Sequence, residues 1–410
     1  MIKRLMFLLT FGLLVACQAR TDPGQLSVVT AGSTHTCGLV SNRIPPGRGR
    51  LFCWGDATDS QLGDGTRNST LTPIRSTVLY DIDPDLVDIT SVAAAGTPGI
   101  APGGAHTCVV LAGTLSTVRC WGSNQNGQLG ESPLSNPTAF VDVVGIATAK
   151  AVAASNANTC AVLSDGTLKC WGDNRFGQLG DGSVSFHPNP VSVTGITNAT
   201  AVSLGDAFAC ALLADGSIRC WGRNSRGQLG NGTTTDSATS VVVAGIRNAI
   251  DIGAGSDSAC AVLSDGTARC WGDNTHGQLG NGMTINSSTP VPVGGLVFVN
   301  LDPSGVGYTN VAVGSAFACA RRSDGTVRCW GSNNHGQLGN GSIADSSLPV
   351  NVSGINKASH VAAAGAFGGA DACAALADAA IWCWGGNAKG QLGNGTTRGS
   401  ITPVRVTGIP

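Results

Sequence analysis

Short apolar runs, separated by clusters of turn-forming residues, recur along this chain. The pattern is clearest between residues 150 and 199, where small or β-branched residues dominate four runs. These runs lie around Val152, at Thr159–Leu163, at Thr167–Trp171 and at Pro190–Val193. No stretch has the 3.6-residue period of an amphipathic helix. The pattern therefore predicts four short β-strands in about 50 residues, with turns between them.

The same unit occurs seven times, and such repetition decides the fold class before any single element does. Each copy contains Cys-Trp-Gly, and Gln-Leu-Gly begins seven residues after each tryptophan. The tryptophans are Trp54, Trp121, Trp171, Trp221, Trp271, Trp330 and Trp384. The units run approximately over residues 26–88, 89–149, 150–199, 200–249, 250–309, 310–359 and 360–410. Four short strands in each unit favour a propeller blade over a helical repeat.

The middle hairpin of a unit is specific enough to predict its turn. Leu163-Ser164-Asp165-Gly166-Thr167 fits a three-residue loop with a type I turn and Gly166 in the left-handed region. This loop would place Cys160 directly opposite Cys170 on the neighbouring strand. Opposed residues in antiparallel strands are close enough at Cα for a disulfide.

The cysteine count follows the repeat. Of fifteen cysteines, Cys17 stands apart and the other fourteen fall two to a unit. We expect seven disulfides within the units, because the chain starts with an export signal and would meet an oxidising compartment. The pairs are Cys37–Cys53, Cys108–Cys120, Cys160–Cys170, Cys210–Cys220, Cys260–Cys270, Cys319–Cys329 and Cys373–Cys383. The alternative is free thiols that fill a core, whereas metal binding is disfavoured because zinc-type spacings are absent.

The motif ACALLADGSIRCWGRNSRGQLGNG at residues 209–232 resembles the repeat of the regulator-of-chromosome-condensation family. That resemblance covers nearly everything from Leu26 to Pro410, and it implies an all-β, seven-bladed propeller with four antiparallel strands per blade. The paired cysteines depart from the eukaryotic pattern and are similar to what an exported bacterial version would carry. Some copies are degenerate: Ala57 replaces the repeat asparagine, Ser60 replaces a glycine, and Ala379 replaces the glycine of the Asp-Gly turn.

The two ends of the repeat array predict how the ring closes. The array begins at residues 26–29 with a first-strand sequence and finishes at residues 402–406 with a fourth-strand sequence. We expect these two strands to pair side by side, which would leave no bare sheet edge.

The N-terminal residues predict export. Lys3 and Arg4 precede a mostly apolar run from Leu5 to Ala16, which is too short to span a bilayer. The run ends in Leu14-Val15-Ala16-Cys17, which resembles a bacterial lipobox. Residues 1–17 are therefore expected to be a lipoprotein signal with Cys17 as the lipidated residue, followed by a linker at 18–25 and the propeller at 26–410. The expected location is the cell envelope, at the outer membrane or cell surface.

Charge and side-chain chemistry exclude several classes of function. The chain has 24 basic and 25 acidic residues, so nucleic acid is not expected as a partner. We find no catalytic constellation and expect no enzyme activity, cofactor or small-molecule substrate. His35 and His106 share one repeat position, but the other units place Asn158, Phe208, Ser258, Phe317 and Asp371 there, so no metal site is expected.

Two sets of positions are candidates for binding a partner. One is the residue before the glycine of Gly-Gln-Leu-Gly, or its equivalent, which varies among the units: Asp59, Asn126, Phe176, Arg226, His276, His335 and Lys389. The other is a pair of insertions at residues 41–50 and 78–87, which the alternation of strands should place on one face of adjacent blades. They carry Arg43, Arg48 and Arg50, and Asp81, Asp83 and Asp85. Both sets also fit tolerated surface variation, although long loops on a rigid ring often bind partners.

Two classes of function follow. The first is a non-enzymatic protein-binding scaffold, with an envelope or extracellular protein as its partner and a lipid anchor in the membrane. The second, implied by the eukaryotic namesake of the family, is guanine-nucleotide exchange on a small GTPase. Export and seven disulfides favour the first, because such GTPases are cytosolic or nuclear.

Overall fold

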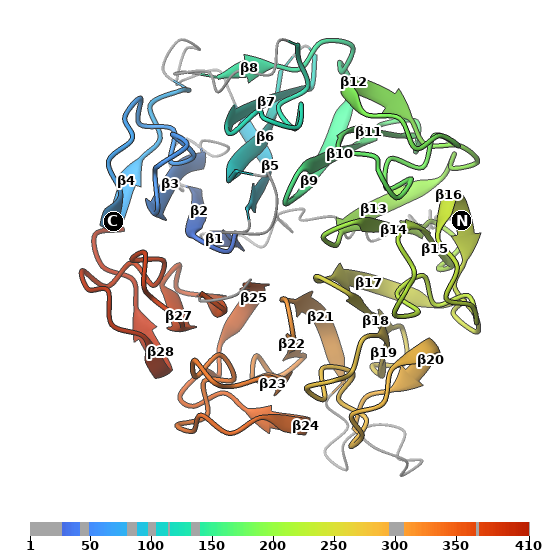
Figure 1. Ribbon diagram of the computed structural model, residues 1–410. Helices are drawn as coiled ribbons and strands as arrows, with labels where there is room; N and C mark the ends of the chain where they lie inside the picture. The colour runs from blue at the N-terminus through green and yellow to red at the C-terminus, as the bar shows by residue number, and fades with distance from the viewer. Residues whose placement is uncertain are drawn as a thin grey trace, which may run out of the picture.

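The computed structural model is a ring of seven four-stranded antiparallel sheets around a central channel (Figure 1). It describes residues 27–41, 49–79, 88–96, 104–113, 115–132, 140–294, 307–365 and 369–409. All regular secondary-structure elements among these described residues are β-strands. The fold class expected from the repeat is confirmed: the protein is a seven-bladed β-propeller.

Each blade consists of four strands that are consecutive in sequence, with the first strand at the channel. The first three blades contain β1 (Ser27–Ala31), β2 (His35–Ser41), β3 (Gly49–Gly55), β4 (Thr70–Arg75); β5 (Asp88–Ala95), β6 (His106–Ala112), β7 (Thr117–Gly122), β8 (Val141–Asp142); and β9 (Ala149–Ser155), β10 (Asn158–Leu163), β11 (Leu168–Gly172), β12 (His187–Ser192). Blades four and five contain β13 (Ala199–Leu204), β14 (Phe208–Leu213), β15 (Ile218–Gly222), β16 (Ser237–Val242); and β17 (Ala249–Ala254), β18 (Ser258–Leu263), β19 (Ala268–Gly272), β20 (Ser287–Pro292). Blades six and seven contain β21 (Tyr308–Val313), β22 (Phe317–Arg322), β23 (Val327–Gly331), β24 (Ser346–Asn351); and β25 (Ala358–Ala364), β26 (Asp371–Leu376), β27 (Ile381–Gly385), β28 (Ser400–Arg405).

The Asp-Gly turns form as their sequence predicts. In blade three the Leu163 N–H donates to the Thr167 carbonyl, and Gly166 takes a φ of 80°. Asp165 closes the turn by accepting the Thr167 N–H through Oδ1 at 2.9 Å. These hydrogen bonds lower the pKa of the exposed Asp165 carboxyl. The turn therefore fixes the register of the second and third strands in each blade that carries it.

That register aligns the cysteines. Cys160 lies directly opposite Cys170, and their Cα atoms are 4.1 Å apart. All fourteen of these cysteines are bonded, in the seven within-blade pairs that the repeat predicts. Each disulfide joins the two middle strands of its blade, and the sulfur atoms lie in the core between neighbouring blades.

Closure of the ring differs from the prediction. β1 pairs only with β2 and β28 only with β27, so the first and last strands do not share a sheet. The expectation was wrong because β1 lies at the inner edge of its blade and β28 at the outer edge of its own. The ring closes by packing instead: Trp54 of blade one donates its indole N–H to the Gln391 carbonyl of blade seven at 2.7 Å.

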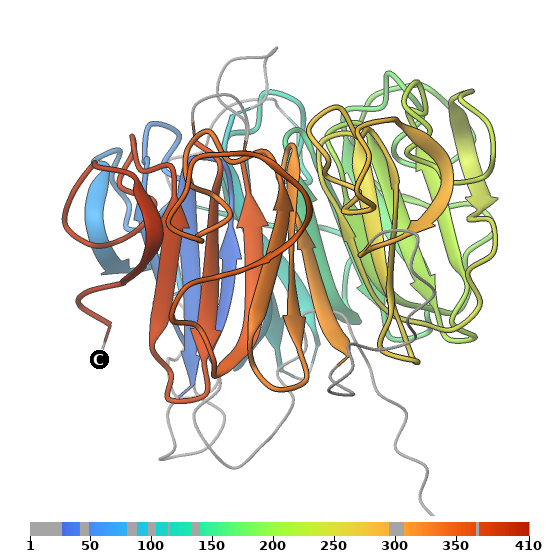
Figure 2. The same ribbon diagram turned by 90° about the horizontal axis from the view of Figure 1, so that it is seen from below.

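The alternating strand directions give the ring two distinct faces (Figure 2). The turn after each first strand lies beside the loop after each third strand, as the bond from the Asp173 N–H to the Ala157 carbonyl illustrates. We call this the Gln-Leu-Gly face. The other side, the hairpin face, carries the Asp-Gly turns and the links between units: the Ala199 N–H donates to the Gly166 carbonyl at 2.8 Å.

Candidate functional site

The repeat tryptophans join neighbouring blades. In blade four the Trp221 indole N–H donates to the Gln178 carbonyl of blade three at 2.9 Å, and Trp221 is fully buried. Gly180, which follows in Gln-Leu-Gly, has a φ of 71°, and a Cβ there would lie 2.7 Å from the Trp221 ring. The same bond is made by all seven repeat tryptophans: Trp54, Trp121, Trp171, Trp221, Trp271, Trp330 and Trp384.

The repeat asparagine and glutamine organise the loop that holds this carbonyl. The buried Asn224 accepts the Leu229 N–H through Oδ1 and donates to loop carbonyls, including that of Thr233 at 3.1 Å. Gln228 accepts the Arg226 N–H through Oε1 at 2.8 Å. The residues that are constant among the units therefore build the blades and join them.

The degenerate positions of the terminal copies retain the geometry of the repeat. Ser60 takes a φ of 64° and Ala379 a φ of 67°, which are left-handed conformations that favour glycine. These blades therefore keep the same turns at the expense of backbone strain.

The repeat position shared by His35 and His106 is buried and structural. His35 Nε2 lies 2.8 Å from Thr107 Oγ1 of the next blade, and Thr107 donates its only hydroxyl proton to the Gln61 carbonyl. His35 must therefore donate from Nε2. Burial lowers the pKa of His35 to about 4, and burial with the nearby His35 lowers that of His106 to about 3.

Asp371 occupies the corresponding place in blade seven, and burial raises the pKa of its carboxyl well above the usual value. Within the described ranges, no group of three or more His, Cys, Asp or Glu side chains is arranged to hold a metal ion.

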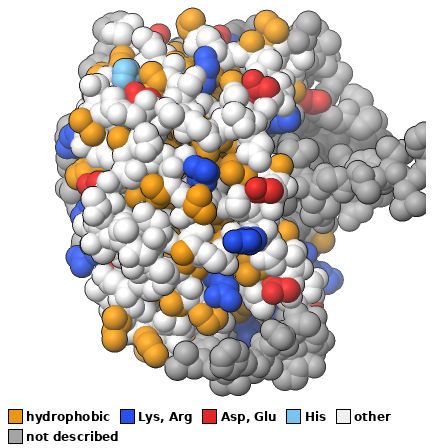
Figure 3. Space-filling view, turned by 90° about the vertical axis from the view of Figure 1, so that its right-hand side faces the viewer, with side chains coloured by type: hydrophobic (Ala, Val, Ile, Leu, Met, Phe, Trp, Pro, Cys, Tyr) orange, Lys and Arg blue, Asp and Glu red, His pale blue; other side chains and the backbone are white. Residues whose placement is uncertain are grey.

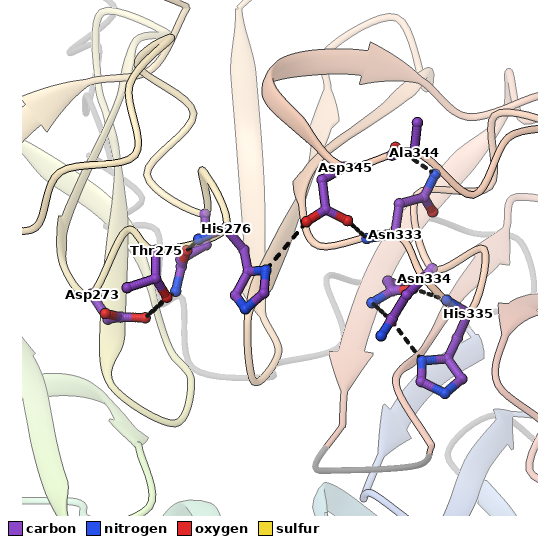
Figure 4. Close-up of polar contacts among 10 residues, drawn as sticks. Asp273, Thr275, His276, Asn333, Asn334, His335, Ala344 and Asp345 are labelled. Carbon is purple, nitrogen blue, oxygen red and sulfur yellow. Dashed lines mark hydrogen bonds and ion pairs between the residues drawn. The ribbon is translucent and has the colours of Figure 1, made fainter.

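The variable position before the Gly-Gln-Leu-Gly glycine lies on the Gln-Leu-Gly face, where some of its side chains contact the next blade. His276 of blade five points toward blade six, where its Nδ1 lies 3.2 Å from Asp345 Oδ2 (Figure 4). His335, one blade further on, contacts Asn334 beside it at 2.7 Å instead (Figure 4). Arg223 lies over the Phe176 ring, 5.7 Å from its centroid. These side chains do not converge on one point, so they offer separate contacts around the rim.

Of the candidates on the hairpin face, Arg50 alone lies among the described residues, where it is exposed in β3. Cys17, Arg43, Arg48, Asp81, Asp83 and Asp85 lie outside the described residues. The expectation of adjoining basic and acidic loops therefore stays a prediction.

The central channel holds a cavity of about 470 Å³ lined by the first strands of all seven blades. On blades one to four most of the lining residues are apolar, among them Val28, Val92 and Val202, and Thr30 and Ser203 are polar. On blades five to seven apolar residues such as Ile252 and Val311 also line the cavity, and they are joined there by the polar residues Asp251, Thr309, Asn310, Arg321, Ser359 and His360. Sequence reasoning missed this polar sector, although aligning the units signals it: Arg321 stands where other blades have Val162, Leu212 and Val262.

Buried contacts connect the polar sector across blades. Asp251 Oδ2 accepts the Asn310 side-chain N–H at 2.9 Å and the Val311 backbone N–H at 2.8 Å. Asn310 Oδ1 in turn accepts the Val361 N–H at 3.2 Å. Burial raises the pKa of Asp251 to about 6, while these hydrogen bonds oppose the shift.

On the outer surface of blades three to five, neither positive nor negative side chains predominate. Figure 3 shows basic and acidic side chains scattered among apolar and uncharged ones. Among the residues that the structure describes, no helix has the length and apolarity needed to cross a bilayer.

Fold and motif together define a propeller in which Trp-Gly and Gln-Leu-Gly hold neighbouring blades together. The family model of the RCC1-like domain matches residues 86–410, and that of the regulator of chromosome condensation (RCC1) repeat matches residues 48–98. The chain belongs to this RCC1-like family.

Curated relatives match over shorter stretches. The human E3 ubiquitin-protein ligase HERC2 is 33% identical over 94 residues, which are 23% of this chain and 2% of that protein. The mitochondrial RCC1 domain-containing protein RUG3 of Arabidopsis thaliana is 32% identical over 103 residues, which are 25% of this chain and 23% of that protein. The matches thus span only a small part of each relative.

Solved structures match over most of the ring. Prp20p from Saccharomyces cerevisiae has a TM-score of 0.73 and 20% identity, covering 87% of this chain and 85% of that one. Human WBSCR16 has a TM-score of 0.70 and 21% identity, covering 83% of this chain and 85% of that one. At these identities the likeness is one of fold.

Proposed function

We propose that this protein is a non-enzymatic protein-binding scaffold, held at a bacterial cell envelope by a lipid on Cys17. One observation carries the proposal: the constant residues of each unit are buried in blade packing, whereas the varied residues lie on the rim. A rigid ring with a varied surface is suited to binding another protein. The seven disulfides support an oxidising, extracytoplasmic location.

Guanine-nucleotide exchange is the second candidate. The structure of Prp20p was described with its binding to Gsp1p and histones, and another structure has Kap60 bound to yeast RCC1 (Prp20). These partners support protein binding as a use of the fold. The disulfides oppose an exchange activity on cytosolic or nuclear GTPases.

The position of β1 constrains where a partner of an anchored ring would bind. The register pairs Ser27 with Val40, beside the second-to-third-strand hairpin, so the chain enters the ring on the hairpin face. Ten residue steps separate Cys17 from Ser27, a reach of at most about 36 Å. A lipid on Cys17 would therefore hold the hairpin face toward the membrane. We propose that a partner of blades one and two, contacted by Arg43, Arg48 and Arg50 and by Asp81, Asp83 and Asp85, lies at the membrane surface.

The experiment compares the two faces. Envelope extract is passed over three immobilised proteins, of which the first is the soluble ring. In the second, residues 41–50 and 78–87 are trimmed to the length of the third unit. In the third, Phe176, Arg226 and His276 are changed to alanine. We expect trimming to lower capture of the partner at least 10-fold, about 1.4 kcal/mol, and the triple change to leave it intact.

Unchanged capture after trimming, with loss after the triple change, would move the site to the Gln-Leu-Gly face. The captured fraction could instead contain a small GTPase. If the ring accelerated nucleotide exchange on that GTPase after its purification, guanine-nucleotide exchange would be favoured. Anchoring is tested separately with a fatty-acid probe, which should label the parent protein but not Cys17→Ser.

A further inference from the structure

The outer strand of every blade is an open sheet edge, and most of these strands carry a residue that blocks further pairing. A proline has no N–H to donate, and a charge on an edge strand disfavours the addition of another strand. The outer strand of blade two, β8, has only two residues, and one of them is Asp142. Prolines lie in five other outer strands: Pro73 in β4, Pro188 and Pro190 in β12, Pro290 and Pro292 in β20, Pro349 in β24 and Pro403 in β28.

The outer strand of blade four lacks both kinds of protection. This strand, β16, lies at the outer edge of the ring (Figure 1) and has the sequence Ser-Ala-Thr-Ser-Val-Val over residues 237–242. It contains neither a proline nor a charged residue, and it is six residues long. An uncharged edge strand that ends in β-branched residues is suited to pairing with another strand.

The position without its proline faces away from the blade. The Val243 N–H donates to the Ile218 carbonyl of β15 at 2.9 Å, so the alternation of the strand turns the backbone groups of Val242 and Ser240 outward. The register confirms this for Ser240, because the equivalent residues of five other blades have no N–H and the same pairing: Pro73, Pro190, Pro290, Pro349 and Pro403. The N–H of Ser240 is therefore not needed within the blade.

The edge offers an acceptor and an apolar side chain as well. The Ser240 carbonyl accepts the guanidinium of Arg219, which lies on β15, at 3.3 Å. A carbonyl oxygen has two lone pairs, so it can accept a second donor from outside the blade. The side chain of Val242 is 52% exposed. Strand addition at β16 would therefore form main-chain hydrogen bonds and cover an exposed valine.

We propose that β16 is the pairing edge for a second copy of this chain, with the two β16 strands antiparallel about a twofold axis. Ser240 of one copy lies opposite Val242 of the other, and the backbone groups of each pair exchange hydrogen bonds. The two four-stranded blades become one continuous sheet across the dimer. Because Ser240 and Val242 point to the same side of the sheet, the two exposed valines cover each other near the axis.

Charge favours a second copy over a different protein as the occupant. Residues near a twofold axis lie close to their own counterparts, so a charged edge repels itself. The Val242 position is taken by Arg75, Arg405 and Asp142 in blades one, seven and two. A strand from another protein can attract such a charge with an opposite one, whereas self-pairing requires a neutral edge, as β16 provides.

The geometry also fixes how the two rings are oriented. The twofold axis is perpendicular to the shared sheet, so the hairpin faces of the two rings point in opposite directions. The pair fits rings that are free of the membrane or anchored on membranes that face each other. The proposal does not rest on the lipid anchor or on the scaffold function, because it concerns the outer edge of blade four.

The test is sedimentation velocity of the soluble ring, residues 18–410, with variants that restore residues of other blades. Ser240→Pro removes the outward N–H, and Val242→Arg introduces the charge found in blades one and seven. Ser192→Arg is the matched control, because it places the same charge at the equivalent position of β12, which Pro190 already protects. We expect a dimer in the parent and in Ser192→Arg, and dimer formation weaker by about 10-fold or more in Ser240→Pro and in Val242→Arg.

Mixing two charge variants tests the pairing directly. Val242→Arg and Val242→Asp each repel their own copies but attract each other near the axis, so each alone should be mainly monomeric and an equimolar mixture should regain the dimer. A monomeric parent, or equal dimer formation by the parent, Ser240→Pro and Val242→Arg, would overturn the proposal. A monomeric parent that loses capture of an envelope protein on Ser240→Pro would give this edge a different occupant and would also overturn it.

Discussion

The contacts between blades repeat all around the ring, whereas the wall of the central channel changes from blade to blade. Each interface has a buried tryptophan that donates to the glutamine carbonyl of the preceding blade. The channel lining, by contrast, has most of its polar side chains on blades five to seven and is mainly apolar on blades one to four. The comparison teaches that seven nearly identical units can form a ring with a distinct sector. Residues at the blade interfaces must make the same contacts in every blade, whereas residues that line the channel only have to pack against their neighbours.

The largest effect is expected from breaking a repeated interface. Trp271→Ala removes a fully buried ring and its 2.9 Å bond to the Gln228 carbonyl, and should lower the free energy of unfolding by about 3–5 kcal/mol. Denaturant unfolding of the purified ring would measure it. Trp382, which lies outside the repeat motif and is only partly buried, is the matched control; a similar loss in Trp382→Ala would contradict a special role for the interface tryptophans.

The next effect concerns the polar sector and pH. Asp251 has its pKa raised from 3.8 to about 6, so between those values the folded state binds more protons than the unfolded state. This carboxyl therefore makes the protein less stable as pH rises through about 4 to 6. Asp251→Asn removes the dependence, so its stability relative to the parent should rise by up to about 3 kcal/mol between pH 4 and pH 8.

Unfolding of both proteins across this pH range measures the difference in their stability. The buried histidines make both proteins more stable as pH rises, and this shared contribution cancels in the difference. Parallel curves for parent and variant would show that Asp251 does not titrate in this window.

A smaller loss of stability is expected from removing a single disulfide. Cys210→Ala with Cys220→Ala opens one disulfide whose cysteines are ten positions apart, and should lower stability by about 2–3 kcal/mol. Thermal unfolding under oxidising conditions is the measurement. After full reduction the double variant and the parent should differ much less; an equal difference in both conditions would mean that packing, not the bond, is responsible.

The smallest expected effect is a gain in stability. Ala379→Gly relieves a left-handed conformation at φ 67°, and should raise stability by about 1 kcal/mol. Ala268→Gly, in a regular strand, is a control that should destabilise. A loss in Ala379→Gly would indicate that the buried methyl group contributes more than the strain costs.

The sequence allowed the blades to be predicted because their determinants are local. The Asp165-Gly166 turn fixes the register that opposes Cys160 to Cys170, and this inference needs only one unit. Ring closure was predicted wrongly because it depends on which edge of each sheet faces the channel. The interface packing between Trp54 and Gln391 joins residues 337 positions apart, although both belong to the repeat.

The polar sector was missed for a different reason. In blade six the register shifts between Tyr308 and Asn310, and bulges of this kind decide which side chains face the axis. A strict two-residue alternation does not reveal them. Comparing units position by position would have singled out Arg321, because an arginine among aliphatic residues is unexpected in a buried strand.

Each blade is one uninterrupted stretch of chain, and this has a consequence for how such rings evolve. Duplication of a single unit supplies a complete sheet together with its own tryptophan, carbonyl acceptor and disulfide, and no strand has to be exchanged between distant parts of the gene. The size of the ring is then limited by the angle between neighbouring blades and not by chain connectivity. A lineage can therefore gain or lose a blade in one genetic event, and the new copy is free to diverge at the positions that face the axis and the rim.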